Sequence, residues 1–206
     1  MEDINIYNEF DDMKLKDSLL RGIYSYGYEK PSAIQQKAII PCTEGKDIIA
    51  QAQSGTGKTA TFTIGLLQRL EETQQTTQVI ILSHTRELAI QIHEVVSNIS
   101  NFMKVSINLS VGGIDVRDNI HSLSDKPHII IGTPGRVLDM IQRRYIDIDT
   151  IKLLVIDEAD ELLSNIFISQ IKDIFSFLPS KMQVCLFSAT MNDHFFDITN
   201  KFMSEP

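Results

Sequence analysis

Short aliphatic runs alternate with amphipathic helical patterns along most of this chain. The runs are largely β-branched and lack polar alternation, as expected of strands that are buried on both sheet faces; they cover 47–52, 78–83, 105–111, 128–133, 152–157 and 183–188. Between them, apolar residues recur three or four positions apart in 58–72, 86–102, 135–143 and 167–178. This alternation predicts an α/β fold with a mostly parallel sheet, helices on both faces and right-handed crossovers.

The length of 206 residues favours one large domain. Two further helical segments, at about 14–26 and 32–40, precede the first strand and are separated by Gly27 and Pro31. The two cysteines, Cys42 and Cys185, have no metal-ligand spacing and fit a reducing compartment, although a single disulfide is left open. No stretch approaches the roughly 18 apolar residues that span a bilayer, and the acidic start resembles no targeting signal. We expect a cytoplasmic domain without membrane contact, with the nucleus as the alternative, and we expect it to be monomeric.

The net charge of −8 argues, on the chain average, against a constitutive nucleic-acid binder. The charge is distributed unevenly, however. Residues 1–12 carry −5, residues 145–206 carry −6, and residues 13–144 carry +3. The acidic total therefore leaves room for salt-sensitive contacts between a locally basic strip and a phosphate backbone.

The first strand runs into a glycine-rich loop, 53–57, and then into a helix. This context predicts a phosphate-binding P-loop, in which backbone N–H groups and the helix N-terminus face phosphate oxygens. Lys58 is expected to reach the β- and γ-phosphates, and Thr59 to offer its hydroxyl to Mg²⁺. Ala52 replaces the usual first glycine, so its φ must stay negative. The alternative is a glycine-rich turn without a ligand.

Acidic residues lie at the end of the strand 152–157 and directly after it. Asp157 stands where the Mg²⁺ partner of a P-loop belongs, and we expect it to bind the ion through water. Glu158 is placed to polarise the attacking water as a general base. The alternative for both is an acidic helix cap and first turn. Taken with the P-loop, they predict an ATP- and Mg²⁺-dependent hydrolase site with Lys58, Asp157 and Glu158 as catalytic residues.

Residues 157–160 read Asp-Glu-Ala-Asp, which is the signature sequence of the DEAD-box RNA helicases. The chain resembles that family. The segments 52–59, 85–89, 112–113, 133–136 and 188–190 resemble the other motifs of that family's first domain, in the same order. The resemblance implies a RecA-like P-loop domain over 1–206, with an adenine-recognition extension at 1–45 and a core at 46–206. It also implies a C-terminal helicase domain that this chain does not contain.

For the nucleotide, the resemblance implies two kinds of contact. Gln35 belongs to a segment like the family's Gln motif and is expected to read adenine with a bidentate amide contact, although Ser32-x-x-Gln35 is also a capping box. Phe10 is expected to stack on the adenine, with a hydrophobic staple on the N-terminal helix as the alternative. The full set of nucleotide contacts implied is Phe10, Lys30, Pro31, Gln35, Ser54, Gly55, Thr56, Gly57, Lys58 and Thr59.

For RNA, the resemblance implies sequence-independent contacts with the backbone, made by residues that follow strand ends. These residues are Thr85, Arg86, Gly112, Gly113, Thr133, Gly135 and Arg136. Each motif alone is weak, since Thr-Pro-Gly-Arg is also an ordinary turn and helix start. Ser188 and Thr190 are expected to hydrogen-bond Asp160 and couple the nucleotide state to RNA binding, with simple helix capping as the alternative.

Two positions depart from the family pattern. His84 stands where the family usually has proline, and Asn165-Ile166 stands where near relatives carry Arg-Gly. A missing proline loosens the RNA loop, unless His84 supplies a phosphate contact of its own. We therefore expect RNA binding to be weaker than in typical relatives.

The resemblance implies an RNA-dependent ATPase and helicase that unwinds short duplexes, most similar to members acting in translation initiation or at exon junctions. Scaffold proteins of those two processes are the protein partners it suggests. The resemblance places an arginine finger on the C-terminal helicase domain, and such a residue is worth on the order of 10³–10⁵ in rate. The 206-residue chain alone is therefore expected to bind ATP or ADP weakly and hydrolyse it negligibly. The alternatives are an ATP-gated RNA clamp or scaffold in mRNA processing and an unrelated P-loop ATPase that ignores RNA.

Overall fold

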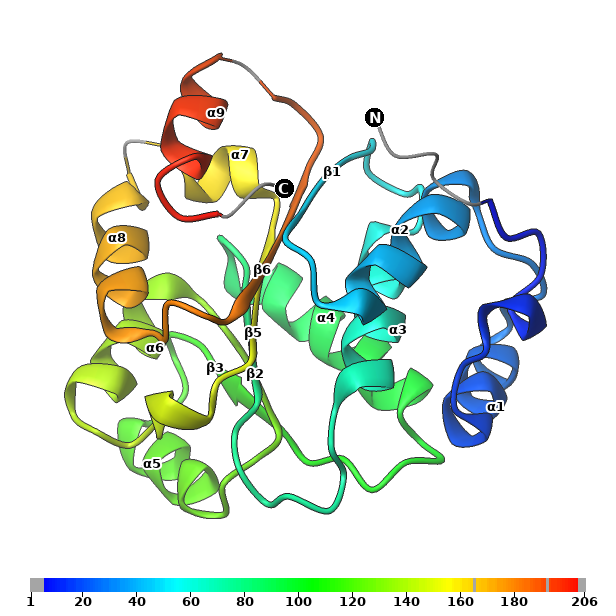
Figure 1. Cartoon of the computed structure of the whole chain (residues 1–206). Coiled ribbons are helices and arrows are strands. Elements are labelled where there is room, and N and C mark those ends of the chain that lie inside the picture. The colour runs from blue at the N-terminus through cyan, green and yellow to red at the C-terminus, as the bar shows by residue number, and fades with distance from the viewer. Residues whose placement is uncertain (1–5, 165, 192, 204–206) are drawn as a thin grey trace.

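The computed structural model describes residues 6–164, 166–191 and 193–203. Its centre is a six-stranded sheet in the order β1-β6-β5-β2-β4-β3, and every neighbouring pair is parallel (Figure 1). The strands are β1 (Ile48–Gln51), β2 (Val79–Leu82), β3 (Ile107–Ser110), β4 (Ile129–Gly132), β5 (Leu153–Asp157) and β6 (Gln183–Ser188). All six lie within the predicted runs, so the predicted α/β fold with a parallel sheet is confirmed.

Helices cover both faces of the sheet, as the alternating pattern predicted. In Figure 1, α1 to α4 lie on one side and α5 to α9 on the other. The first group is α1 (Asp17–Tyr26), α2 (Ala33–Glu44), α3 (Lys58–Arg69) and α4 (Arg86–Ile99). The second is α5 (Val116–Ser124), α6 (Pro134–Gln142), α7 (Ala159–Leu162), α8 (Ile168–Phe177) and α9 (Asp193–Thr199), and two 3-10 turns occur at Asp11–Met13 and Ile148–Thr150.

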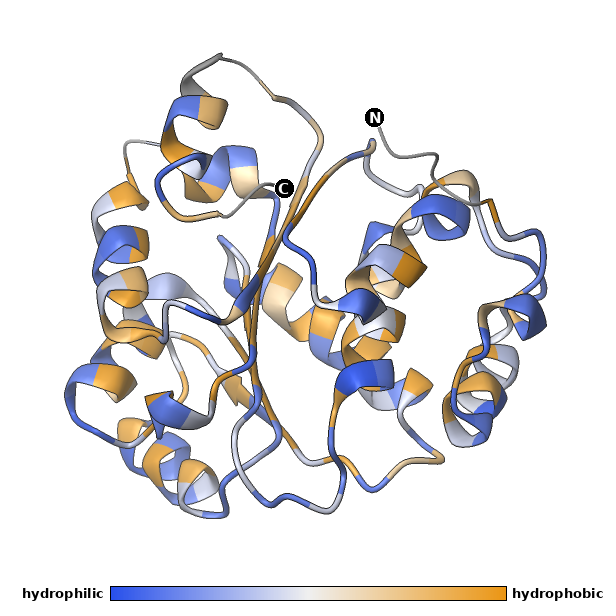
Figure 2. Ribbon diagram, in the orientation of Figure 1, coloured by the Kyte–Doolittle hydropathy of each residue, from blue (hydrophilic) through white to orange (hydrophobic). Residues whose placement is uncertain are grey.

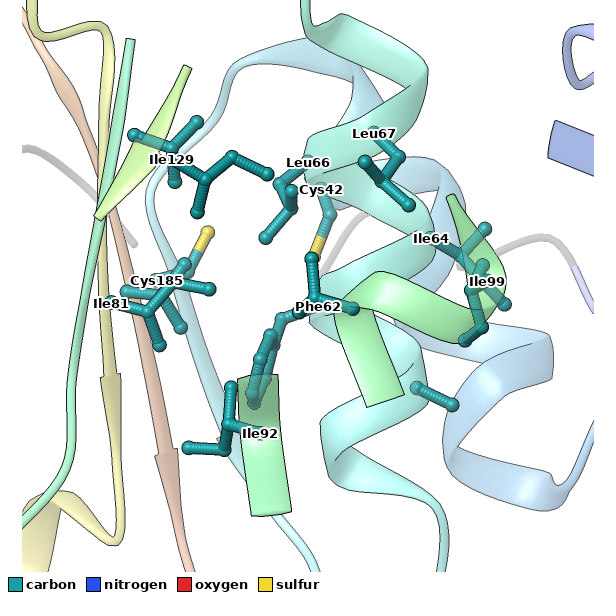
Figure 3. Packing of buried hydrophobic residues seen from close by; sticks show 14 of the residues in the cluster. Cys42, Phe62, Ile64, Leu66, Leu67, Ile81, Ile92, Ile99, Ile129 and Cys185 are labelled. Atoms are coloured by element: carbon teal, nitrogen blue, oxygen red, sulfur yellow. The ribbon is translucent and has the colours of Figure 1, made fainter. Parts of the chain in front are cut away.

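Successive strand residues enter two separate hydrophobic cores, because side chains alternate between sheet faces. In β2, Ile81 packs with α1 to α4 while Ile80 and Leu82 pack on the opposite side. Figure 2 shows the resulting band of hydrophobic strands between the helical layers. Figure 3 shows the first core, where Phe62 of α3 packs between Ile92 and the strand residues Ile81 and Cys185.

Local helix boundaries differ from the predictions where tertiary packing outweighs sequence signals. The second helix was predicted to stop near residue 40, but α2 continues through Pro41 to Glu44. Cys42, in that last stretch, is buried in the first core, and its carbonyl accepts a bond from Gln183 Nε2 at 3.2 Å. Both cysteines are free thiols, so the disulfide alternative is not realised.

The strand order decides which loops share the carboxyl edge of the sheet. The segments following β1, β6 and β5 lie together, and so do those following β2, β4 and β3. Ligands of open α/β sheets bind at this edge. Within the described ranges, no helix has the length and apolar character needed to cross a membrane.

Candidate nucleotide and RNA site

The sequence motifs gather into two neighbouring groups along the carboxyl edge. We call residues 52–59, 157–160 and 188–190, which follow β1, β5 and β6, the P-loop half. Residues 83–86, 112–114 and 133–136, which follow β2, β3 and β4, form the arginine half. The boundary between the halves lies where β5 pairs with β2.

The P-loop is held open by two glycines in the left-handed region. Gly55 has φ +80° and Gly57 has φ +99°, conformations that other residues adopt only at a cost. A Cβ at Gly57 would also lie 2.8 Å from Gln35 Nε2, so glycine is required there twice over. Ala52 does not have a positive φ, which confirms the condition set for it. Ser54, Gly55 and Thr56 are exposed, and a Cβ at Gly55 would meet no described atom within 4 Å.

Lys58, at the first position of α3, is the most informative residue of this half. Its side chain is buried, with 7% of the residue exposed, and its Nζ has no hydrogen-bond partner among the described residues. A buried ammonium without a partner is costly. Phosphate oxygens are strong hydrogen-bond acceptors, and a lysine at this position of a P-loop is suited to bind them. Lys58 therefore supports a nucleotide-binding loop over a ligand-free glycine turn.

The Gln motif braces the P-loop from α2. Gln35 is buried; its Oε1 accepts from the Ser32 backbone N–H at 2.8 Å and its Nε2 donates to the Gly57 carbonyl at 3.5 Å. Ser32 Oγ donates to the Thr56 carbonyl at 2.8 Å. The capping box is thus confirmed, with Ser32 as the N-cap of α2. Adenine contact stays a prediction, for which the Gln35 amide retains a second hydrogen and further lone pairs.

Phe10 requires a correction. Its ring is fully buried in the first core and meets Tyr24 edge-on, with the ring centroids 6.3 Å apart. A buried ring offers no open face to a base, so the structure supports packing on the N-terminal helix instead of adenine stacking in this conformation. Of the other expected adenine-side residues, Pro31 is buried and Lys30 is exposed, with its Nζ 3.2 Å from Glu9.

Asp157 ends β5 as a nearly buried carboxylate. Burial raises its pKa to about 6, and this outweighs the Glu158 N–H, which donates to Asp157 Oδ1 at 3.0 Å, and the nearby charge of Lys58. Thr59, half-buried at the start of α3, supplies a hydroxyl in the same half. Carboxylate and hydroxyl oxygens suit Mg²⁺. The described residues hold no cluster of three or more His, Cys, Asp or Glu able to bind a metal, so Mg²⁺ here would take its remaining ligands from water and phosphate.

Of the two hydrogen bonds predicted for Asp160, the one from Thr190 is present, between the segments at the ends of β5 and β6, and the coupling role stays a prediction. Thr190 donates from Oγ1 to Asp160 Oδ2 at 2.6 Å and from its backbone N–H to the same oxygen at 3.1 Å. Ser188 donates to the Thr190 carbonyl at 2.6 Å. Burial alone would raise the pKa of Asp160, but the hydrogen bonds from Thr190, helped by Ser188, lower it below its usual value. Asp160 is therefore an ionised and well-satisfied carboxylate.

The arginine half brings its predicted residues together through backbone contacts. Thr85 caps α4, with Oγ1 accepting from the Leu88 N–H at 3.2 Å. The guanidinium of Arg86 lies against Gly113, whose φ of +85° and lack of a Cβ make room for it. Arg136 donates from Nη2 to the Ile114 carbonyl at 2.9 Å. Thr133 is the N-cap of α6, and Gly112 and Gly135 are exposed.

A buried polar cluster beneath these segments was not predicted. Asn119 is almost fully buried in α5, and its Nδ2 donates to Ser110 Oγ at 3.1 Å and Asn108 Oδ1 at 3.3 Å. Its Oδ1 lies 3.4 Å from Arg136 Nη1 as an acceptor. The cluster fixes Arg136 relative to the loop after β3. Its sequence signal is a polar residue on the apolar face of α5, in line with Val116 and Leu123.

The two departures from the family pattern have different outcomes. His84 lies against Glu158, with Nδ1 3.0 Å from Oε2, and so faces the P-loop half across the boundary. Asn165 lies outside the described residues, and Ile166 beside it is exposed. The expected weakening of RNA binding stays a prediction.

Comparison with known proteins decides the family. The model of the DEAD/DEAH box helicases matches residues 32–198. The chain belongs to this family. It is 52% identical over 202 residues to the ATP-dependent RNA helicase eIF4A of Candida albicans, covering 98% of this chain and 51% of that relative. The chain thus spans about half the length of the curated relatives it matches.

Solved structures agree with the family and the fold. A DEAD box protein from the hyperthermophile Methanococcus jannaschii is 35% identical with a TM-score of 0.92, covering 97% of this chain and 55% of that one. S. cerevisiae Dbp5 bound to RNA and ADP BeF3 is 35% identical with a TM-score of 0.88, covering 96% of this chain and 50% of that one. The prediction of a RecA-like DEAD-box domain is confirmed.

Proposed function

We propose that this chain is the ATP-binding, N-terminal RecA-like domain of an RNA-dependent ATPase and helicase. The observation that carries the proposal is Lys58, a buried ammonium without a hydrogen-bond partner in the described chain, at the mouth of an open P-loop. The adjoining arginine half supplies Arg86 and Arg136 beside exposed glycines, where a phosphate backbone can approach. Relatives about 52% identical are named ATP-dependent RNA helicases.

The nucleotide would be held mainly by its phosphates. Backbone N–H groups of 54–58, the α3 N-terminus and Lys58 are the groups suited to the phosphate oxygens. Thr59 and Asp157 would hold Mg²⁺, the latter through water, and the ion would neutralise charge on the phosphates.

Glu158 is the proposed general base. Its carboxylate would accept a proton from water as the water oxygen bonds to the γ-phosphorus, while the bond from that phosphorus to the bridging oxygen breaks and ADP leaves. Its backbone has φ +49°, a strained conformation for a non-glycine residue that is typical of functional positions. Such strain fixes the direction in which the side chain leaves the strand end.

RNA would lie across the arginine half and be held by its backbone, without reading of bases. The proposed residues are Thr85, Arg86, Gly112, Gly113, Thr133, Gly135 and Arg136. Because this half is locally basic within an acidic chain, RNA affinity should fall steeply with salt. We place the protein in translation initiation and in the cytoplasm, on the strength of its eIF4A relatives, with scaffold proteins of that process as candidate partners.

The test measures ATP hydrolysis with and without single-stranded RNA, for the natural protein that contains this chain and for the 206-residue chain alone. We expect RNA-stimulated turnover in the natural protein and its loss in Glu158→Gln. We expect the chain alone to bind nucleotide and hydrolyse it negligibly. Robust RNA-stimulated turnover by the chain alone would refute the proposed dependence on a second domain, and RNA-insensitive turnover of the natural protein would favour a P-loop ATPase of another kind.

A further inference from the structure

His84 occupies the boundary between the two halves of the carboxyl edge. Strands β2 and β5 pair with Leu82 opposite Ile156, so the residues two positions beyond, His84 and Glu158, emerge side by side. His84 is preceded by buried Ser83 and followed by Thr85, the N-cap of α4. A single side chain therefore connects the proposed RNA segment to the proposed general base.

The contact joins His84 Nδ1 to Glu158 Oε2 at 3.0 Å. Both side chains are largely shielded from water, with 21% and 28% of their surfaces exposed. Nδ1 itself is buried and makes no directional hydrogen bond within the described residues, so the ring N–H does not point straight at the carboxylate. The atoms are at ion-pair distance with poor alignment, and a small rotation of either side chain would produce a full hydrogen bond.

This contact leaves the general base able to act. A carboxylate has two oxygens, so an imidazole on Oε2 leaves Oε1 available to a water molecule. Catalytic bases are commonly oriented by a third group bonded to the side away from the substrate. His84 has that relation to Glu158, because β2 lies on the opposite side of β5 from β6 and β1, whose loops form the P-loop half.

The other end of the connection is the start of α4. Ser83 Oγ donates to the Thr85 carbonyl at 3.2 Å, which ties the residues on either side of His84 together. Arg86 follows directly and lies against Gly113. A phosphate bound at Thr85 and Arg86 would act on the same short segment that carries His84.

We propose that His84 is a positioning residue that orients Glu158 and transmits RNA binding at Thr85 and Arg86 to the general base. The inference rests on the proposed function, because it assigns Glu158 and the RNA segment the roles given above. It explains a position where the family usually has proline, a residue that has no donor for a carboxylate. This chain therefore has a contact between its arginine half and the proposed general base Glu158.

The first experiment separates the chemical step from binding in the natural protein. His84→Ala removes the imidazole, and His84→Asn keeps an N–H donor near the place of Nδ1. We expect His84→Ala to lower the RNA-stimulated kcat about tenfold, a part of the roughly 10²–10⁴-fold contribution of a general base. The KM for ATP should change less than about twofold, because the contact orients the base and does not bind nucleotide. His84→Asn should recover most of kcat, and His121→Ala, an exposed histidine of α5, should match the parent.

Three results would overturn the proposal: an unchanged kcat in His84→Ala, a loss confined to KM, or a loss in His84→Asn equal to that in His84→Ala. Failure of the proposed function has a different signature, because the parent itself would then lack RNA-stimulated turnover.

The second experiment needs no turnover and uses the 206-residue chain. Glu158→Gln removes the charge beside His84, so the ¹⁵N and ¹H resonances of the His84 ring should shift in NMR spectra, while those of His121 stay in place. Adding single-stranded RNA should move the same His84 resonances, and Arg86→Ala should weaken that response. Unchanged His84 resonances in Glu158→Gln, or RNA shifts that spare His84, would contradict the connection.

Discussion

The two halves of the carboxyl edge differ in how fully their polar groups are satisfied. In the P-loop half, Lys58 Nζ is buried without a hydrogen-bond partner in the described structure, and Asp157 carries a pKa raised to about 6 by burial. In the arginine half, Arg136 is bonded to Ile114 and Asn119, and Thr85 caps a helix. The P-loop half thus holds charges that favour a ligand at a cost in stability, whereas Thr85 and Arg136 of the arginine half are already held by hydrogen bonds. The exception in the arginine half is His84 Nδ1, which is buried without a hydrogen bond among the described residues.

The largest effect is expected when the P-loop half loses the buried ammonium of Lys58. Lys58→Ala should reduce the affinity of the 206-residue chain for ATP with Mg²⁺ by about 100-fold, or about 2.7 kcal/mol. The free energy of unfolding without nucleotide should rise modestly, because the variant no longer buries an ammonium that lacks a hydrogen-bond partner. Titration calorimetry and urea unfolding measure the two quantities. The exposed Lys37→Ala in α2 is the matched control and should leave both unchanged. A nucleotide affinity that survives in Lys58→Ala would remove the main support for the site.

Asp157→Asn tests whether the second buried charge also costs stability. The carboxyl has a pKa near 6 in the fold against 3.8 ordinarily, so the folded chain binds more protons than the unfolded chain between those pH values. Stability from this group therefore falls as pH rises from about 4 to 6 and stays low above it. The variant should be more stable than the parent by about 2–3 kcal/mol at pH 7.5, and the difference should shrink toward zero at pH 4.

Urea unfolding in a chelating buffer at both pH values measures this difference. ATP with Mg²⁺ should then stabilise the parent but stabilise the variant far less, because the variant has lost a proposed metal-binding carboxylate. A variant less stable than the parent at pH 7.5 would show that the carboxylate is satisfied and that the contrast between the halves is wrong.

Part of the contrast between the two halves can be predicted from the sequence, and part of it cannot. The strands, their parallel direction and the placement of Lys58, Asp157 and Thr190 after strand ends were predictable, because continuous apolar runs and motif spacing are local signals. The order of the strands in the sheet was not predicted. Satisfaction of polar groups is not local. Asn119 reaches Arg136 from another helix, and His84 meets Glu158 only because β2 pairs with β5.

Errors in the predicted elements have the same origin. The second helix was predicted to end near residue 40, but α2 continues through Pro41 to Glu44, with Cys42 buried in the first core. Phe10 was assigned to adenine by resemblance, whereas the apolar ring is buried with Tyr24 beside it. Helices α5, α7 and α9 were not predicted. Helices α7 and α9, at four and seven residues, are too short for a clear periodic signal, and the polar Asn119 interrupts the apolar face of α5.

Asn119→Ala tests the arginine half, where satisfied groups should be expensive to disturb. The change leaves Asn108 Oδ1 and Ser110 Oγ without the donor from Nδ2 in a buried site, which should cost about 2 kcal/mol of unfolding free energy. RNA affinity of the natural protein should fall through loss of Arg136 positioning, while nucleotide affinity of the chain stays unchanged. Thermal unfolding and fluorescence anisotropy measure these effects. Exposed Asn98→Ala in α4 is the control, and equal losses in the two variants would argue against a preformed arginine half.

The smallest expected effect concerns Asp160, a satisfied carboxylate inside the P-loop half. Thr190→Val removes the hydroxyl that donates to Oδ2 at 2.6 Å but keeps the side-chain shape and the backbone donor. Because Thr190 lowers the pKa of Asp160, its stabilising contribution is present above the ordinary carboxyl pKa of 3.8 and is lost as pH falls through the lower folded value. The variant should lose about 1 kcal/mol at pH 7, since the pair is partly exposed, and the loss should shrink once the pH falls below the lowered pKa of Asp160. A loss that persists at low pH would mean that Thr190 acts through packing and not through its hydrogen bond to the ionised Asp160 carboxylate.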